Sequence, residues 1–170
     1  MNLARFLSPK SIRLEPISSR PEIPEDEDEV SKRDMQTYRE EIIKENAQLL
    51  YNSKKVQNLS KLTVELVNRE RRSTSIIGSG IAIPHVRTLQ TKNFVMGFLR
   101  VSEGIEMDKE EEPIRIFIPM VAPPYDDKLY LKVYKQLAKG FLETDALDQL
   151  LGVYSEGEVI RIFNDVFRTI

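Results

Sequence analysis

The stretch Ile77-Gly78-Ser79-Gly80-Ile81-Ala82-Ile83-Pro84-His85 holds the chain's only histidine. Its two glycines relax the backbone, and the three apolar residues after them are typical of a short strand. The proline has no N–H to donate, so it ends the hydrogen-bond ladder of that strand. We therefore predict that His85 lies at the end of a strand, where ligands and catalytic groups concentrate in α/β folds.

Two further strands are predicted downstream of the histidine. One covers residues 94–101. The other covers residues 114–121, and apolar side chains on both of its faces indicate a central position in the sheet. The acidic stretch 103–112 between them is predicted to be a surface loop, and Pro123 and Pro124 end the second strand.

The N-terminal part contains a strand signal and then an acidic run. Residues 11–17 alternate apolar and polar side chains, as in a short strand, and Pro16 favours an edge position or a strand end. Residues 18–31 include five consecutive acidic residues, 25–29, which repel one another and bury no apolar surface. We predict a flexible, solvated acidic insertion, and a plain loop is favoured over a partner-binding role.

Helices are predicted from capping signals and periodic apolar residues. Ser31, with Asp34 three residues later, resembles a capping box at the start of a helix. A second helix follows Ser60 and runs out at the charged stretch 68–72. The expected buried stripes are Met35, Tyr38, Ile42, Ala47 and Leu50 in the first helix and Leu62, Leu66 and Val67 in the second.

The C-terminal third is also predicted to be helical. Asp126 or Asp127 caps a helix, a short helix follows Thr144, and Ser155 with Glu158 forms a capping box before a last helix. The apolar residues of the two longer helices are Tyr130, Val133, Tyr134, Leu137, Phe141 and Leu142, and then Val159, Ile160, Phe163, Val166 and Phe167. This order predicts a single α/β domain over residues 1–170, with a mixed β-sheet flanked by helices on both faces.

Composition excludes several classes of protein. The 170 residues include no cysteine, which rules out disulfides, zinc–thiolate sites and a cysteine nucleophile. One histidine without a carboxylate cluster argues against a metal site, and a net charge of −2 argues against a nucleic-acid binder. There is no signal peptide and no apolar run of about 20 residues, so we expect a cytoplasmic protein with no membrane insertion.

His85 has two interpretations when only its neighbours are considered. Histidine titrates near pH ~6.5, so a neutral ring nitrogen is available to attack phosphorus. Arg87 follows it, and the basic cluster Arg69, Arg71 and Arg72 precedes it; a guanidinium binds phosphoryl oxygens with two parallel hydrogen bonds. From spacing alone, a plain polar residue at a strand end is the favoured interpretation.

A family resemblance changes that balance. Arg69-Glu70, Ser73-Thr74 and the stretch 77–85 resemble the active-site signature of the fructose/mannitol/nitrogen-regulatory enzyme IIA family of the bacterial phosphotransferase system. Three further family-like segments follow in order: Glu103-Gly104-Ile105, Pro113-Ile114-Arg115 and Val121-Ala122-Pro123. The resemblance covers most of the chain from about Leu59 onward.

The resemblance implies a phosphocarrier. His85 would accept a phosphoryl group from the histidine-containing phosphocarrier protein, HPr, or from its nitrogen-branch counterpart, and Arg69 would help to hold that group. The family fold is a mixed sheet with helices on both faces. No cofactor or metal is implied, and the downstream partner would be a regulatory protein or an enzyme IIB.

The chain departs from the family pattern at two positions near the histidine. The family usually carries a second histidine before a leucine, and the matching pair here is Tyr130-Leu131. A tyrosine hydroxyl can donate to a phosphoryl oxygen, but Tyr130 also fits the apolar stripe of its helix, so core packing explains it equally well. Val86 stands where the family often has a small residue.

Three functions remain to be compared. The first is a phosphohistidine carrier that stands alone and is regulatory, since the chain carries no membrane segment and no second carrier domain. The second is a non-catalytic enzyme IIA-like module that binds other proteins. The third is a sugar-transport enzyme IIA that passes phosphate to a separate enzyme IIB.

Overall fold

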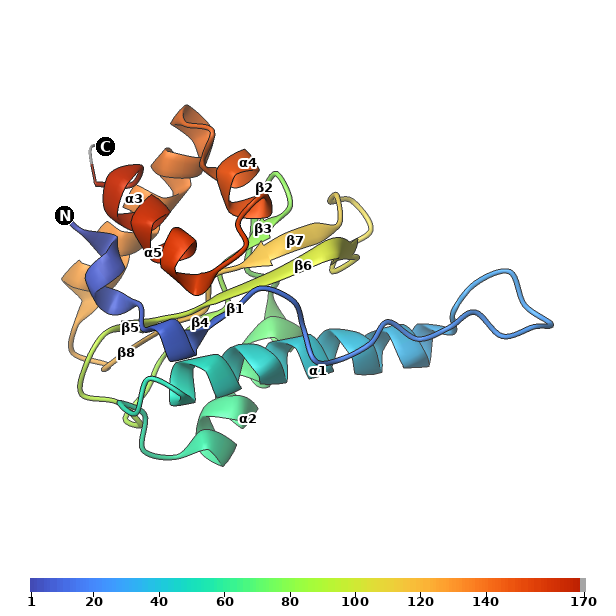
Figure 1. The fold of residues 1–170 in the computed structure, drawn as a ribbon. Coiled ribbons are helices and arrows are strands. Elements are labelled where there is room, and N and C mark those ends of the chain that lie inside the picture. Colours follow the sequence, from blue (N-terminus) through green and yellow to red (C-terminus); the bar gives the residue numbers. More distant parts are fainter. Residues whose placement is uncertain (169–170) are drawn as a thin grey trace.

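The computed structural model describes residues 1–168 and shows two β-sheets between two layers of helices (Figure 1). The helices are η1 (Leu3–Phe6), η2 (Pro9–Ser11), α1 (Lys32–Tyr51), α2 (Leu59–Arg72), α3 (Asp127–Glu143), α4 (Ala146–Leu151) and α5 (Glu156–Asp165). The strands are β1 (Ile12–Arg13), β2 (Ile76–Gly78), β3 (Ile81–Ala82), β4 (His85–Arg87), β5 (Val95–Met96), β6 (Phe98–Ile105), β7 (Ile114–Phe117) and β8 (Met120–Ala122). The predicted α/β fold is confirmed, but the single predicted sheet is divided in two.

The smaller sheet continues three strands of the larger one. The five-stranded sheet has the order β1-β6-β7-β3-β2, and the three-stranded sheet has the order β4-β8-β5. Along the chain β3 leads into β4, β5 into β6 and β7 into β8. The predictions of unbroken strands over 94–101 and 114–121 are therefore wrong, because each is split and its two parts belong to different sheets.

The breaks lie side by side and form one crease, made of Pro84, Gly97 and Pro119. Neither proline can donate to a ladder. The Pro84 carbonyl accepts from the N–H after Pro119, and the Pro119 carbonyl accepts from Gly97, each at 2.9 Å. A side chain on Gly97 would meet the Pro119 ring and a backbone carbonyl at 3.0 Å each. His85 consequently begins β4 instead of ending β3, which corrects its predicted position.

Helix α2 differs from the prediction at both ends. It begins at Leu59, before the expected start after Ser60, because the Asn58 side chain accepts a hydrogen bond from the first turn and caps it. It continues through the charged stretch 68–72, where basic side chains complement the negative end of the helix dipole. This extension places Arg69 on rigid helical backbone.

The other predicted helices are present. Ser31 caps α1, Asp126 caps α3, and Ser155 with Glu158 forms the full capping box of α5. The apolar stripe predicted for α3 is wrong at Leu142, which is 85% exposed because the helical period carries it past the buried face.

Each face of the sheets packs against its own helices. In β7, Ile116 joins the core cluster beneath α3, α4 and α5, and Phe117 joins the cluster beneath α1 and α2. Both residues are fully buried, which confirms the predicted central position of this strand. Figure 1 shows α1 and α2 below the sheets and α3 to α5 above them.

The N-terminal segment supplies an edge strand and a long loop. β1 pairs with β6 at an edge of the larger sheet, as predicted, although it covers only part of 11–17. Residues 18–31 hold no helix or strand. Arg20 still bonds to Gly104 and Glu106 at the end of β6, and the middle of the segment extends beyond α1 and away from the layers (Figure 1). β6 runs to Ile105, so the predicted loop 103–112 begins at Glu106.

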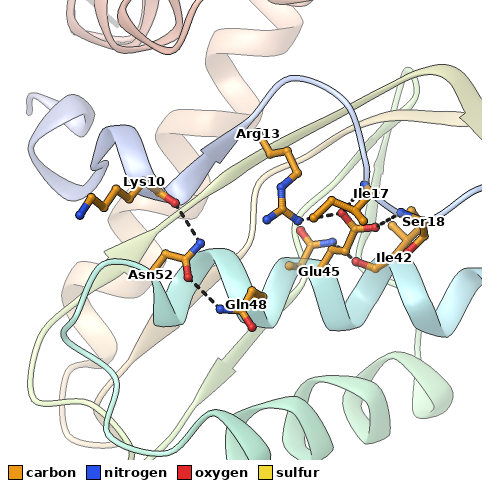
Figure 2. Close-up of polar contacts among 9 residues, drawn as sticks. Lys10, Arg13, Ile17, Ser18, Ile42, Glu45, Gln48 and Asn52 are labelled. Atoms are coloured by element: carbon orange, nitrogen blue, oxygen red, sulfur yellow. Dashed lines mark hydrogen bonds and ion pairs between the residues drawn. The ribbon is translucent and has the colours of Figure 1, made fainter.

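A buried carboxylate fastens this segment to α1 (Figure 2). Glu45 accepts from the backbone N–H groups of Ile17 and Ser18 at 2.9 and 2.8 Å, and from Arg13 at 2.8 Å. These four residues are called the Glu45 cluster below. Across residues 1–168, no helix has the length and apolarity needed to cross a membrane.

Candidate functional site

A surface pocket beside the three-stranded sheet brings the three predicted site residues together. Its cavity volume is about 610 Å³. The lining residues are Arg69, His85, Val86, Arg87, Pro124, Asp127, Tyr130 and Leu131. They come from α2, from β4 and from the start of α3 with the loop before it. The pocket therefore exists only where these distant parts of the chain meet.

The His85 ring is held by a backbone carbonyl. Its Nδ1 lies 2.5 Å from the carbonyl oxygen of Ile83. A carbonyl oxygen only accepts, so in the neutral ring Nδ1 carries the proton and Nε2 keeps its lone pair. Burial is the main influence on the pKa of His85 and lowers it. The hydrogen bond to the Ile83 carbonyl raises the pKa, and the nearby charge of Arg69 lowers it. The resting ring is thus neutral near pH ~7, with Nε2 as its basic nitrogen.

Two tyrosines of α3 pack against this ring. The ring centroids of His85 and Tyr130 are 5.1 Å apart with a tilt of 55°. Tyr134, one helical turn further on, meets the same ring edge-on at 6.0 Å. Burial raises the pKa of Tyr130, so its hydroxyl stays protonated and able to donate a hydrogen bond. Packing and hydrogen-bond donation are both available to Tyr130 in this position.

Arg69 lies in the last turn of α2 and faces the pocket. Its positive charge adds to the lowering of the pKa of His85 by burial, and at Tyr130 it opposes the larger, raising effect of burial. Arg69 forms no ion pair with any of residues 1–168, so its charge is available to an anion in the pocket. The adjacent Glu70 turns elsewhere and accepts from the Ser75 hydroxyl.

Arg87 and Asp127 also line the pocket. The sequence offered Arg87 as a basic neighbour of His85 and Asp127 as one of two candidate caps of the next helix, and it did not predict that they pair. They form an ion pair across the pocket rim, from β4 to the first residue of α3. The alternation of a strand gives a usable signal for Arg87, because residues 85 and 87 share one face of β4. Nothing in the sequence pairs it with Asp127, 40 positions away.

The charges of the pocket favour an anion. Two arginines face one carboxylate, and among residues 1–168 only Arg87 pairs with it. Guanidinium groups bind phosphate and carboxylate with two parallel hydrogen bonds. Within residues 1–168, no group of three or more histidine, cysteine, aspartate or glutamate side chains is placed to hold a metal ion.

The chain is similar to known proteins in sequence and in fold. The family model described as "Phosphoenolpyruvate-dependent sugar phosphotransferase system, EIIA 2" matches residues 26–166. A relative, the fructose-specific EIIABC component of the phosphotransferase system in Bacillus subtilis, is 27% identical over 127 residues. That alignment takes in 74% of this chain but only 20% of the relative, so the chain spans about a fifth of its length.

Solved structures share the fold. The nitrogen regulatory protein IIA-Ntr from Neisseria meningitidis superposes with a TM-score of 0.75 over 95% of this chain and 98% of that one, at 22% identity. Enzyme IIAMTL from Escherichia coli, solved in complex with phosphorylated enzyme IIBMTL, gives a TM-score of 0.66 over 92% of this chain and 96% of that one, at 18% identity. These likenesses establish the architecture.

Proposed function

This chain belongs to the EIIA 2 family of the phosphoenolpyruvate-dependent sugar phosphotransferase system, whose members carry phosphoryl groups, and on that premise we propose that it carries one on His85. The observation that supports this most directly is the basic Nε2 of a neutral histidine in a pocket with Arg69, which forms no ion pair with any of residues 1–168. The carrier would be a phosphotransferase with a phosphohistidine intermediate.

The chemistry is a transfer between two nitrogens. The P–N bond of the donor's phosphohistidine breaks, its electron pair returns to the donor ring, and that ring takes up a proton. A new P–N bond forms at His85 Nε2 from the lone pair of that nitrogen. Positive charge then develops on the His85 ring, and the Ile83 carbonyl stabilises it through the Nδ1 proton. The same charge makes the ring a good leaving group for onward transfer.

Arg69 and Tyr130 act on the transferred group. Arg69 binds the equatorial oxygens and offsets their charge while the group is in flight. Tyr130 orients the imidazole by ring packing, and its hydroxyl donates to a phosphoryl oxygen. It cannot supply the positive charge of the second histidine that it replaces, so we expect the phosphoryl group to be held mainly by arginine.

The donor we propose is HPr or its nitrogen-branch counterpart, and the working compartment is the cytoplasm. The fold likeness to IIA-Ntr favours a regulatory carrier, in which the charge on His85 controls the binding of a downstream protein. The fructose-specific relative and the mannitol complex favour the alternative, a sugar-transport carrier that passes the group to an enzyme IIB.

A second candidate function is a module that binds proteins without transferring phosphate. The observation that favours it is Tyr130, which stands in place of the second family histidine and packs on His85 with no charge of its own. Arg69 supports the carrier instead, because it has no ion-pair partner in the part of the chain that the structure describes, and a purely structural contact has no need of such a cation.

The test measures phosphoryl gain by intact mass. The protein is incubated with phosphoenolpyruvate, enzyme I and HPr, beside His85→Ala and beside Arg71→Gln, an exposed arginine outside the pocket that pairs with Glu40. We expect one added phosphoryl group, lost in acid, in the wild type and in Arg71→Gln but not in His85→Ala. No mass gain from either HPr or its nitrogen-branch counterpart would reject the carrier in favour of the binding module.

A further inference from the structure

Arg87 stands beside His85 but is turned to a different partner. The two residues share one face of β4 and line the same pocket. Arg87 acts electrostatically on Tyr130, whose pKa it lowers. Yet its guanidinium pairs with the carboxylate of Asp127, and the two side chains remain 49% and 63% exposed. Arg87, the cation nearest to His85 on β4, is therefore already paired with a solvent-exposed carboxylate, that of Asp127.

Building on the phosphocarrier function proposed above, we propose that Arg87 is a second phosphoryl-binding cation that Asp127 holds in reserve. In the resting protein Arg87 pairs with Asp127. When His85 carries a phosphoryl group, Arg87 leaves the carboxylate and binds the phosphoryl oxygens together with Arg69. Arg87 thus supplies charge at a site where the family's second histidine is replaced by tyrosine.

The exchange is favourable because the two anions differ in strength. An exposed ion pair stabilises a protein by only about 0–1 kcal/mol, so Arg87 loses little on leaving Asp127. A phosphoryl group brings a charge of roughly −1.5 to −2 and three acceptor oxygens, which suit the planar fork of a guanidinium. The phosphoryl group therefore outcompetes a single exposed carboxylate.

Asp127 tolerates the loss of its partner. It is the first residue of α3, where the positive end of the helix dipole stabilises a carboxylate. It is not the cap, since Asp126 accepts from the N–H of Leu129. Releasing Asp127 thus leaves the helix start intact and adds an uncompensated negative charge at the rim beside Pro124 and Leu131. A partner that touches this rim meets different charges before and after phosphorylation.

The prediction is that Arg87→Gln and Asp127→Asn act in opposite directions. The probe is inorganic phosphate, titrated into the full chain while the ring signals of His85 are followed by NMR. We expect Arg87→Gln to weaken phosphate binding about fivefold and Asp127→Asn to strengthen it about twofold, in line with an exposed charge-assisted contact. Arg71→Gln, which breaks the exposed pair with Glu40 outside the pocket, is the matched control and should bind like the wild type.

The same variants are then phosphorylated by HPr and, without any protein donor, by phosphoramidate. Slower phosphoryl gain in Arg87→Gln and equal or faster gain in Asp127→Asn support the exchange. If the wild type gains a phosphoryl group and both variants gain it faster, both slower or both at the wild-type rate, the exchange is overturned and the carrier function stands. No gain from any donor, combined with opposite effects on phosphate binding, rejects the carrier and keeps Arg87 as an anion-binding residue. No gain and no opposite effects reject both.

Discussion

The Glu45 cluster and the His85 pocket are both built on charged side chains, and they differ in how completely those charges are paired. The Glu45 side chain is about 10% exposed, and its carboxylate accepts hydrogen bonds from two backbone N–H groups and from one arginine (Figure 2). In the pocket, only one of the two arginines, Arg87, pairs with the single carboxylate, Asp127, and that carboxylate is exposed. The first cluster is closed to any further ligand, and the second is open to an anion.

The pKa values of the two sites follow the same division. Burial alone would raise the pKa of Glu45, but hydrogen bonds from Ser18, Ile17 and Arg13 outweigh it and lower the pKa. For His85, burial is the larger influence and lowers the pKa, and Arg69 acts in the same direction. Paired charge therefore stabilises the fold at Glu45, whereas burial, assisted by the positive charge of Arg69, keeps the nucleophile His85 neutral.

The largest expected effect on stability is at Glu45. Glu45→Gln places an amide donor against groups that also donate, so we expect the free energy of unfolding to fall by about 2–3 kcal/mol. Glu41→Gln, an exposed glutamate of the same helix, should change it by less than about 0.5 kcal/mol. Urea unfolding measures both, and equal small changes would show that the cluster is not a stabilising unit.

The next largest effect is kinetic and belongs to the pocket. Arg69→Gln should slow phosphoryl gain by about 10- to 100-fold, because it removes the unpaired cation, and should leave the urea midpoint within error. Rapid-quench measurement of phosphoryl gain from phospho-HPr provides the rate. A lowered midpoint with an unchanged rate would make Arg69 a structural residue, like those of the Glu45 cluster.

A smaller effect is expected in the titration of His85. Its midpoint should lie below the ordinary pH of ~6.5 and should rise in Arg69→Gln. In the wild type, the unfolded chain binds the His85 proton more readily than the folded chain does. The stability that His85 contributes should therefore decline as the pH falls from about 6.5 towards the folded pKa. The chain has one histidine, so a single ring signal in NMR reports it. A midpoint at or above 6.5 would contradict the burial argument.

The same linkage has the same sense for the carboxylate of the first cluster, because folding lowers both pKa values. The pKa of Glu45 is lowered by folding, so its stabilising contribution is present above the ordinary glutamate pKa and is lost as the pH falls through the folded value. Subtracting the stability of Glu45→Gln from that of the wild type across acidic pH isolates this contribution. A difference that stays constant with pH would mean that the carboxylate charge is not what the cluster uses.

The smallest expected effect concerns Tyr130. Tyr130→Phe keeps the ring packing on His85 and removes only the hydroxyl, so phosphoryl gain should slow about two- to fivefold. The measurement is the same rapid-quench rate, with Tyr154→Phe at an exposed position as the control. An unchanged rate would assign Tyr130 to packing alone, and a loss of 100-fold would make its hydroxyl a principal phosphoryl ligand.

Local signals in the sequence predicted most of the elements. Ser155 and Glu158 define a helix start through contacts three residues apart, and the apolar run 114–121 indicated a buried central strand. The crease was not predictable in the same way, because Gly97 breaks its strand only through contact with the distant Pro119. The prediction that Leu142 is buried was wrong for a related reason, because tertiary packing decides which helix positions are covered by neighbours.

The candidate site shows the same limit. The family resemblance of the stretch 77–85 and of Arg69-Glu70 predicted His85 and Arg69 as site residues. Both line one pocket together with Tyr130. The Arg87–Asp127 pair joins residues 40 positions apart, and no local pattern links them.

The crease between the two sheets also governs when the pocket can form during protein synthesis. β4, which carries His85, pairs in parallel with β8, and β8 begins only at Met120. Tyr130 and Asp127 emerge later still, on α3. A nascent chain that already displays Arg69 and His85 therefore has no strand on which to seat the histidine. The ribosome must deliver the chain as far as Leu131, the last residue that lines the anion pocket, before the pocket can close, so shorter nascent chains lack it.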